Sequence, residues 1–250
     1  MEALHVVVTM DCEKPNDSGI AAASGPASWS DSARFIEQYA STARLYGFPV
    51  SFFIHPEVAR PHRDLFLELE RAGASIDGLH LHPWKYDPVR HRQHLGHMDE
   101  ASQRAIIARA MGDWSAGLGR RPHYFRPGTF SANDATFRVA TDLGFIGGSL
   151  SVPGRIFPDI GAVWSGCPAD PHLAHGEFRI WPGRLAFANM PLTVDFSETR
   201  RRGVRSWHPD LRPDQSYADV RLQVARVVAQ ILARAPAIAV LNIVTHNDND

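Results

Sequence analysis

Short apolar runs rich in β-branched residues alternate with helical patterns along almost the whole of this sequence, and this order constrains the fold more than any other feature. The runs cover residues 4–9, 49–54, 74–79, 124–125, 145–150 and 238–244. Runs without polar alternation are typical of strands that are buried on both faces. Strands that alternate with helices form parallel sheets through right-handed crossovers. We therefore expect an α/β fold, either a closed (β/α) barrel or an open doubly wound sheet, and we favour the barrel.

Helix starts and stops lie between these runs. Ser30 or Asp31 can cap a helix that extends to Tyr46 before Gly47, and Pro61 opens a segment that ends at Gly73. Three more helices are expected. One begins at Asp99 and extends to Leu118, and the next covers 135–143 after Asn133 or Asp134. The last follows Ser216 and has an apolar stripe of Val220, Val224, Val227, Val228 and Ile231.

Residues 151–213 interrupt this alternation, because they contain eight prolines. We expect long loops there, a hairpin over 178–187, and barrel strands around Arg179 and residues 191–195. The cluster of Arg200, Arg201, Arg202 and Arg205 is expected to be a solvated loop.

Length and composition favour a single domain over residues 1–250. A chain of this length suits one barrel, and 26 basic against 27 acidic side chains give no electrostatic footprint for nucleic acid. The first residues lack the positive charge and apolar core of a secretory leader, and no stretch is apolar enough for a membrane span. Cys12 and Cys167 are too few for a disulfide framework. We therefore expect a cytoplasmic protein without a membrane span.

Acidic, imidazole and guanidinium groups follow four of the expected strands at their carboxyl ends. In barrels and open α/β sheets this is the face on which sites are built, because the loops after parallel strands converge there. The sequence therefore predicts one polar site at this end of the sheet.

Asp11 and Glu13 follow the first strand. Residues two apart in an extended chain point to the same side, so the two carboxylates would repel unless a cation lies beside them. The alternative is a turn after the strand in which an aspartate bonds its own backbone.

His80 and His82 follow the third strand and would project from one face, about 6.6 Å apart by the strand rise. Histidine nitrogens together with a carboxylate are common ligands of Zn²⁺. The alternative for each histidine is a satisfied core or surface residue. His91, His94 and His97 lie further on, either lining the cleft or in a solvated loop.

Arg126 precedes a rigid Pro127-Gly128 turn, and His246 ends the last strand. A guanidinium fork suits a carboxylate, so Arg126 could orient Asp11 and keep it ionised. His246 is placed where an acid for a leaving group would be needed. A surface arginine and a buried histidine without a role are the alternatives.

Taken together, these segments resemble the polysaccharide deacetylases, the carbohydrate esterase family 4 group. The resemblance covers nearly the whole chain. The opening aspartate motif is matched by residues 9–13, and the second-strand segment by 51–54 (Ser-Phe-Phe-Ile). The histidine motif is matched by 78–83, the arginine motif by 125–128, and the closing histidine motif by 244–246.

The resemblance implies a distorted (β/α)7 barrel and a metal-dependent hydrolase that removes an acetyl group from an N-acetylated sugar or a related amide. It implies Asp11 as the base, Arg126 as its partner and His246 as the acid. It also implies a divalent metal, with zinc preferred. We assign His80 and His82 to this metal, together with Glu13, because its spacing places it beside Asp11. Trp84, Pro127 and Gly128 would contact a small-molecule or oligosaccharide substrate.

The sequence departs from the family pattern in two places. The usual histidine pair is four residues apart, and Trp84 stands four residues after His80, so His91, His94 and His97 remain alternatives to His82. Cys12 occupies the position where many members have a metal-binding aspartate. A hydrolase of a small non-sugar amide and a non-catalytic carbohydrate- or metal-binding relative therefore remain alternatives.

Overall fold

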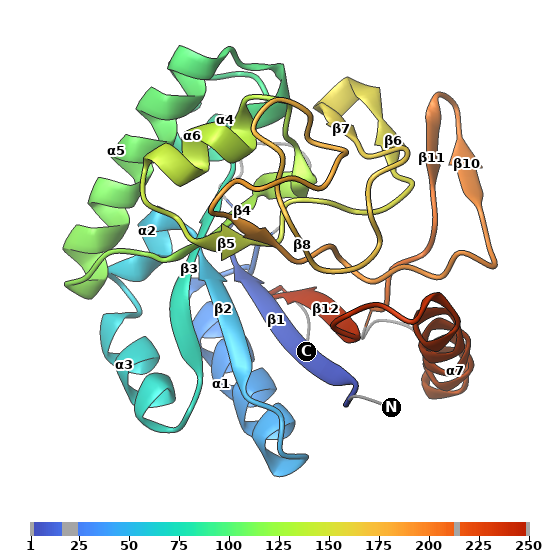
Figure 1. Cartoon of the computed structure of the whole chain (residues 1–250). Helices are drawn as coiled ribbons and strands as arrows, with labels where there is room; N and C mark the ends of the chain where they lie inside the picture. Colours follow the sequence, from blue (N-terminus) through green and yellow to red (C-terminus); the bar gives the residue numbers. More distant parts are fainter. Residues whose placement is uncertain (1–2, 17–24, 213–215, 249–250) are drawn as a thin grey trace.

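The computed structural model describes residues 3–16, 25–212 and 216–248. A curled sheet forms the centre of the molecule, and the helices lie against its outer surface (Figure 1). The expected alternation of strand and helix is confirmed, because each long apolar run contains a strand of this sheet.

Eight strands form the main sheet in the order β12-β1-β2-β3-β4-β5-β9-β8. They are β1 (His5–Cys12), β2 (Val50–Ile54), β3 (Ser75–Leu81), β4 (Tyr124–Pro127), β5 (Gly147–Gly148), β8 (His172–Leu173), β9 (Ala188–Asn189) and β12 (Val240–His246). All neighbouring pairs are parallel except β8 and β9, so seven strands run in one direction.

The sheet curls into a half-barrel, and the chain after β9 lies between its two sides. Met190 N–H donates to Gly148 O at 2.8 Å, while Thr193 N–H donates to Asn242 O of β12 at 3.1 Å. The strand expected over 191–195 therefore occupies a barrel position, although only Val194 makes a β-bridge there, with Asp210. The result is the distorted barrel that the family resemblance implies.

The helices begin and end close to the expected residues. They are α1 (Trp29–Leu45), α2 (Pro56–Ala59), α3 (Arg63–Arg71), α4 (Pro83–Tyr86), α5 (Glu100–Leu118), α6 (Thr136–Asp142) and α7 (Tyr217–Arg234). Asp99 caps α5 by accepting from Ser102 N–H, and Gly119 ends it with a φ of 78°. The segment expected from Pro61 begins two residues later, at Arg63, because the short α2 and a turn precede it.

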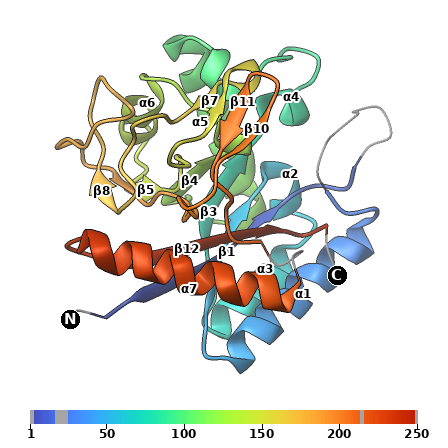
Figure 2. The ribbon, with the colours of Figure 1, turned by 90° about the vertical axis from the view of Figure 1, so that its right-hand side faces the viewer.

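Residues 151–212 differ most from expectation. No strand covers Arg179, and the hairpin predicted over 178–187 is wrong: β8 pairs instead with β9, and Ala174 makes a bridge with Pro182. A second sheet has the order β10-β11-β6-β7 and contains β6 (Ile156–Phe157), β7 (Ala162–Val163), β10 (Arg200–Arg202) and β11 (Arg205–Trp207). The arginine cluster is therefore a β-hairpin and not an irregular loop (Figures 1 and 2).

Two apolar clusters support the fold. The larger lies between the sheet and α1 to α6, and the smaller joins α7 to β12 through Leu211, Val227, Ile231, Ala239 and Leu241. Figure 2 shows α7 lying along β12. None of the described helices is long and apolar enough to cross a membrane.

Candidate active site

Side chains from four strands meet at the carboxyl end of the parallel sheet. Asp11 of β1 is in register with His246 of β12, and His80 of β3 is in register with Arg126 of β4. Glu13 follows β1 directly. The predicted convergence of these distant residues is therefore present.

Asp11 is a buried carboxylate paired with a buried arginine. Arg126 Nη1 donates to Asp11 Oδ1 at 2.6 Å and to Thr9 Oγ1 at 3.0 Å, and its guanidinium carbon lies 4.0 Å from the centroid of the Phe53 ring. Burial by itself would raise the pKa of Asp11, but the charges of Arg126, His80 and His246 outweigh it, and the pKa is lowered. Asp11 is therefore ionised at neutral pH.

The second oxygen of Asp11 faces two imidazoles at longer range. Oδ2 lies 3.8 Å from His80 Nδ1 and 3.9 Å from His246 Nε2. One oxygen is thus held by Arg126, while the other is directed toward the histidines.

Glu13, His80 and His82 form a cluster whose ligand atoms all lie within 4.8 Å of one another. Glu13 Oε1 lies 3.0 Å from His80 Nε2 and 2.9 Å from His82 Nε2. All three side chains are buried. The charges of the two histidines hold the pKa of Glu13 well below its usual value despite burial, so the cluster has an anionic centre.

The contacts of His80 require a positive charge at this cluster. Its Nδ1 lies 3.1 Å from Arg126 O, a pure acceptor, and its Nε2 lies 3.0 Å from Glu13 Oε1. A neutral imidazole carries one N–H, so it cannot donate at both nitrogens. Either His80 is an imidazolium, or Nδ1–H bonds Arg126 O and a cation lies between Nε2 and Glu13. Burial opposes the first, but the charges of Asp11 and Glu13 prevail and raise the pKa of His80.

These donors fit a divalent metal ion. A ligand histidine that gives its other N–H to a backbone carbonyl is the usual arrangement around zinc, and it fixes the ring and its tautomer. Lys85 Nζ lies 2.9 Å from Glu13 Oε2, so Oε1 is the oxygen that remains for a cation. The set offers one carboxylate oxygen and two imidazole nitrogens.

An amide clamp fixes the backbone of Glu13. Asn247 Oδ1 accepts from Glu13 N–H at 2.7 Å, and its Nδ2 donates to Glu13 O at 2.9 Å and to Ser32 Oγ at 2.7 Å. Asn247 directly follows β12, so the end of this strand positions the carboxylate that follows β1.

The loop after β4 presses against His82. A Cβ on Gly128 would lie 2.2 Å from His82 Nδ1, so only glycine allows this approach. The next two residues, Thr129 and Phe130, have φ values of 55° and 56°. This is the left-handed region, which is energetically unfavourable for residues other than glycine. Strain of this kind is concentrated in loops that shape sites.

Comparison with known proteins gives a fold and no sequence relative. No family model matches the chain, and no curated protein is significantly similar to it. A candidate polysaccharide deacetylase from Mycobacterium smegmatis has a TM-score of 0.60 and 16% identity over 98% of this chain and 77% of its own. This chain has the polysaccharide deacetylase fold.

Two further structures agree. An allantoinase has a TM-score of 0.60 and 14% identity, and a candidate polysaccharide deacetylase from Pseudomonas aeruginosa PAO1 has a TM-score of 0.55 and 14% identity. Each covers 98% of this chain and 78% of its own. At such identities the comparison gives the fold, and side-chain roles are argued from geometry.

On this polysaccharide deacetylase fold, the cluster opens into a cleft of about 570 Å³. Its walls include the predicted residues Asp11, His82, Trp84 and His246. The other lining residues are mostly aromatic or basic: Arg92, His94, Phe130, Arg155, Phe157, Arg205 and Arg212, with Thr129 and Ile160. Pro127 and Gly128 are buried, and Thr129 and Phe130 line the cleft beside them. Substrate contacts by Pro127 and Gly128 stay a prediction.

The alternative histidines lie outside the cluster. Among the described residues, the group that could hold a metal consists of Glu13, His80 and His82, without His91, His94 or His97. His94 lines the cleft, and burial lowers its pKa to about 4, so it is neutral there. His97 Nε2 contacts Pro158 O. Cys12 is buried in the core, on the side of β1 away from Asp11 and Glu13.

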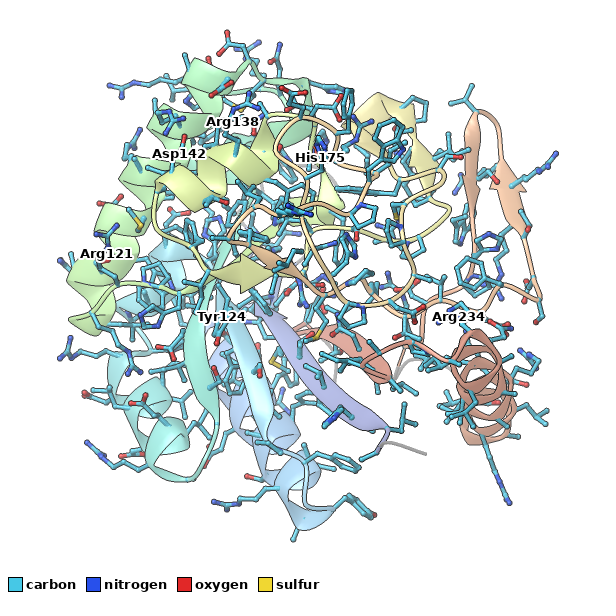
Figure 3. All side chains as sticks on the ribbon, in the orientation of Figure 1. Arg121, Tyr124, Arg138, Asp142, His175 and Arg234 are labelled. Atoms are coloured by element: carbon cyan, nitrogen blue, oxygen red, sulfur yellow. The ribbon has the colours of Figure 1, made fainter. Side chains whose placement is uncertain are left out.

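A second cavity, of about 400 Å³, lies toward the amino ends of the strands. Its walls include Val7, Ser51, Gly147 and Tyr124, which is at the start of β4 (Figure 3). Arg126 also lines this cavity. Among the described lining residues, Arg126 and Tyr124 are the only titratable side chains. Without a base or a ligand cluster, this cavity cannot perform the chemistry that the cleft supports.

Sequence reasoning missed Lys85, Asn247 and Arg155. Lys85 stands three residues after His82, and Asn247 directly follows His246, so proximity to the motifs was an available signal. Arg155 lies in the proline-rich region, where no pattern indicated that it would line the cleft.

Proposed function

We propose that this chain is a metal-dependent hydrolase that removes an acetyl group from an N-acetylated sugar or a related amide. The observation that carries the proposal is the pairing of two features in one cleft. An ionised Asp11 is held by Arg126, and the Glu13, His80 and His82 cluster lies directly beside it.

Glu13, His80 and His82 would hold the cation, and the mixture of oxygen and nitrogen donors favours Zn²⁺. When bound, a divalent ion polarises an acyl carbonyl and lowers the pKa of water near it. The remaining steps belong to side chains of the chain itself.

Asp11 is placed to act as the general base. Arg126 holds Oδ1, which leaves Oδ2 to accept a proton from the water that attacks the acyl carbon. The negative charge that develops on the carbonyl oxygen would be stabilised by backbone N–H groups of the loop after Pro127.

His246 is placed to act as the general acid. Its side chain is 24% exposed and lines the cleft on the Asp11 side. A proton on its imidazole would pass to the amide nitrogen as the carbon–nitrogen bond breaks, which releases acetate and an amine.

A second candidate keeps this chemistry and changes the substrate to a small non-sugar amide. The cleft of about 570 Å³ is large enough for one small molecule, and an allantoinase has the same fold.

The test measures acetate release from N-acetylglucosamine oligomers, and amine release from small acylated amides, after metal depletion and after addition of Zn²⁺, Co²⁺ or Mg²⁺. We expect turnover that depends on the metal.

Asp11→Asn should lower kcat by about 10²- to 10⁴-fold and retain the metal, whereas Glu13→Gln should lose the metal. The control is Asp64→Asn, an exposed aspartate of α3. Metal content that is equal in wild type, Glu13→Gln and His80→Ala would contradict the site, and absence of turnover with every donor would favour a non-catalytic binding protein.

A further inference from the structure

The outer wall of the candidate active site is rich in arginine. Arg92, Arg155, Arg205 and Arg212 all line the cleft that contains Asp11 and His246. Arg205 begins β11 and Arg155 directly precedes β6, and both strands belong to the small sheet that stands beside the carboxyl end of the barrel (Figures 1 and 2). The arginine that neutralises Asp11 is a different one, Arg126.

Arg155 is a buried cation without a carboxylate partner among the described residues. Arg155 is only 6% exposed. Its Nη1 donates weakly to Thr129 O at 3.4 Å, and its Nε has no hydrogen-bond partner. Burial lowers the pKa of Arg155 to about 10, although the charge of Asp210 opposes this shift. Arg155 therefore remains positively charged at neutral pH.

Two aromatic rings position this guanidinium. Its central carbon lies 5.3 Å from the centroid of the Phe130 ring and 5.1 Å from that of the Phe157 ring. Cation–π contacts offset part of the cost of burying the charge, but they leave Nε without an acceptor. A purely structural arginine at this position would be expected to use this donor, so the unused Nε–H indicates a ligand.

The neighbouring charges do not cancel this cation. Arg205 pairs with Asp159 across the cleft wall, and Arg212 Nη2 lies 3.0 Å from Asp210 Oδ2. Arg92 is exposed and makes no ion pair with another described residue. Four arginines thus face two acids on this wall, and the net field is positive.

We propose that the substrate carries an anionic oxygen group, a carboxylate or a phosphate, which Arg155 binds while the acyl amide lies between Asp11 and His246. This inference rests on the proposed deacetylation. Guanidinium groups bind both anions through paired hydrogen bonds, and Trp84, Phe157 and Ile160 provide an apolar surface for the rest of the molecule.

The test compares matched substrates that differ in charge. N-acetylglucosamine 6-phosphate is paired with N-acetylglucosamine for the phosphate, and N-acetylmuramic acid is paired with its methyl ester for the carboxylate. In the wild type we expect kcat/KM for the preferred anionic substrate to exceed that for its neutral partner by about 10- to 100-fold. The preference should fall as salt is added, and the better pair identifies the anion.

Three variants locate the preference. Arg155→Gln should bring the ratio of anionic to neutral kcat/KM close to one, and Arg155→Lys should restore part of it. Arg212→Gln, at a half-exposed position, should lower the ratio in a protein that keeps its fold even if the buried Arg155 variants do not. Arg201→Gln, an exposed arginine of β10 outside the cleft, removes the same charge and should leave the ratio unchanged.

Binding of glucosamine 6-phosphate, measured by calorimetry, separates this inference from the proposed function. Turnover of charged and neutral partners at equal kcat/KM would overturn the anion site and leave deacetylation standing. No turnover, together with binding that Arg155→Gln abolishes, would overturn deacetylation and support the anion site. Neither turnover nor binding would overturn both.

Discussion

Gly128 and His82 are in such close contact that this glycine controls one of the proposed metal ligands. Gly128→Ala places a Cβ at 2.2–2.3 Å from three atoms of the His82 ring, so the ring must move. We expect a loss of about 1–3 kcal/mol in the free energy of unfolding and a lower affinity for Zn²⁺. Urea unfolding and metal titration measure the two effects.

Gly112→Ala is the matched control for this substitution. Gly112 lies within α5, and an added Cβ would meet no atom within 4 Å. Alanine there should raise stability by up to about 1 kcal/mol, because it favours the helix. If both variants changed stability in the same direction, the steric account of Gly128 would be wrong.

Asn247 acts on the site through the backbone of Glu13. Asn247→Leu removes the hydrogen bonds to the N–H and to the carbonyl oxygen of Glu13, which is buried, and should cost about 1–3 kcal/mol of unfolding free energy. Loss of a group that orients a ligand typically lowers metal affinity by about 10- to 100-fold. Both quantities are read from unfolding curves and zinc titrations.

Asn242→Leu separates positioning from stability. Asn242 is a buried asparagine within β12, and its amide donates to Met190 O and Pro191 O, away from Glu13. It should destabilise the protein and leave the zinc affinity of the folded form unchanged. Equal losses of affinity in the two variants would mean that Asn247 has no specific effect on Glu13.

At the scale of elements, Asp195 fastens the end of the barrel segment 191–195 to α7. Its buried carboxylate accepts from Arg226 at 2.8 Å, from Gln230 at 2.9 Å and from Ser197 Oγ at 2.7 Å. Burial alone would raise the pKa of Asp195, but these hydrogen bonds dominate and lower it to about 2. The helix α7, whose apolar side chains pack against β12 and Leu211, thereby gains a polar anchor.

The lowered pKa makes this anchor sensitive to acid. A carboxylate with a depressed folded pKa stabilises the protein above its unfolded pKa of about 4, and the contribution is lost as the pH falls toward 2. We expect the unfolding free energy of the wild type to fall by about 1 kcal/mol more than that of Asp195→Asn between pH 7 and pH 3, because about half of the contribution is lost by pH 3. Urea unfolding at pH 7, 4 and 3 measures it, and parallel pH profiles would refute the assignment.

At the scale of the whole molecule, the proposed cation would connect two strands that are not neighbours. Glu13 follows β1, whereas His80 and His82 belong to the end of β3, and β2 lies between them in the sheet. An ion that binds only the folded state stabilises it by about 2.7 kcal/mol at one hundred times its Kd. For a chain of this size, that corresponds to a rise in Tm of roughly 5–10 °C.

Thermal unfolding with Zn²⁺ and with a chelator tests this connection. The Tm of the wild type should rise with Zn²⁺ and fall with the chelator, while that of Glu13→Gln should respond to neither. An identical response in both proteins would place the stabilising ion at another site.

The long elements could be predicted because their signals are local. Asp99 and Gly119 mark the ends of α5 within the sequence itself, and the buried runs of β1, β3 and β12 leave few alternatives to parallel strands. Carboxyl ends of parallel strands meet at one edge, so the convergence of Asp11, Arg126 and His246 followed from the order of strands alone.

Pairings between distant residues could be decided only by the tertiary structure. The two-residue strands β5, β8 and β9 are too short for any periodicity, and their neighbours choose their partners. His82, rather than His91, His94 or His97, joins Glu13 because the third strand aims it there and Gly128 leaves room for its ring. Arg155 lines the cleft because the second sheet, of β6, β7, β10 and β11, lies beside the cleft. A local sequence pattern cannot predict this contact, because the two surfaces meet only after folding.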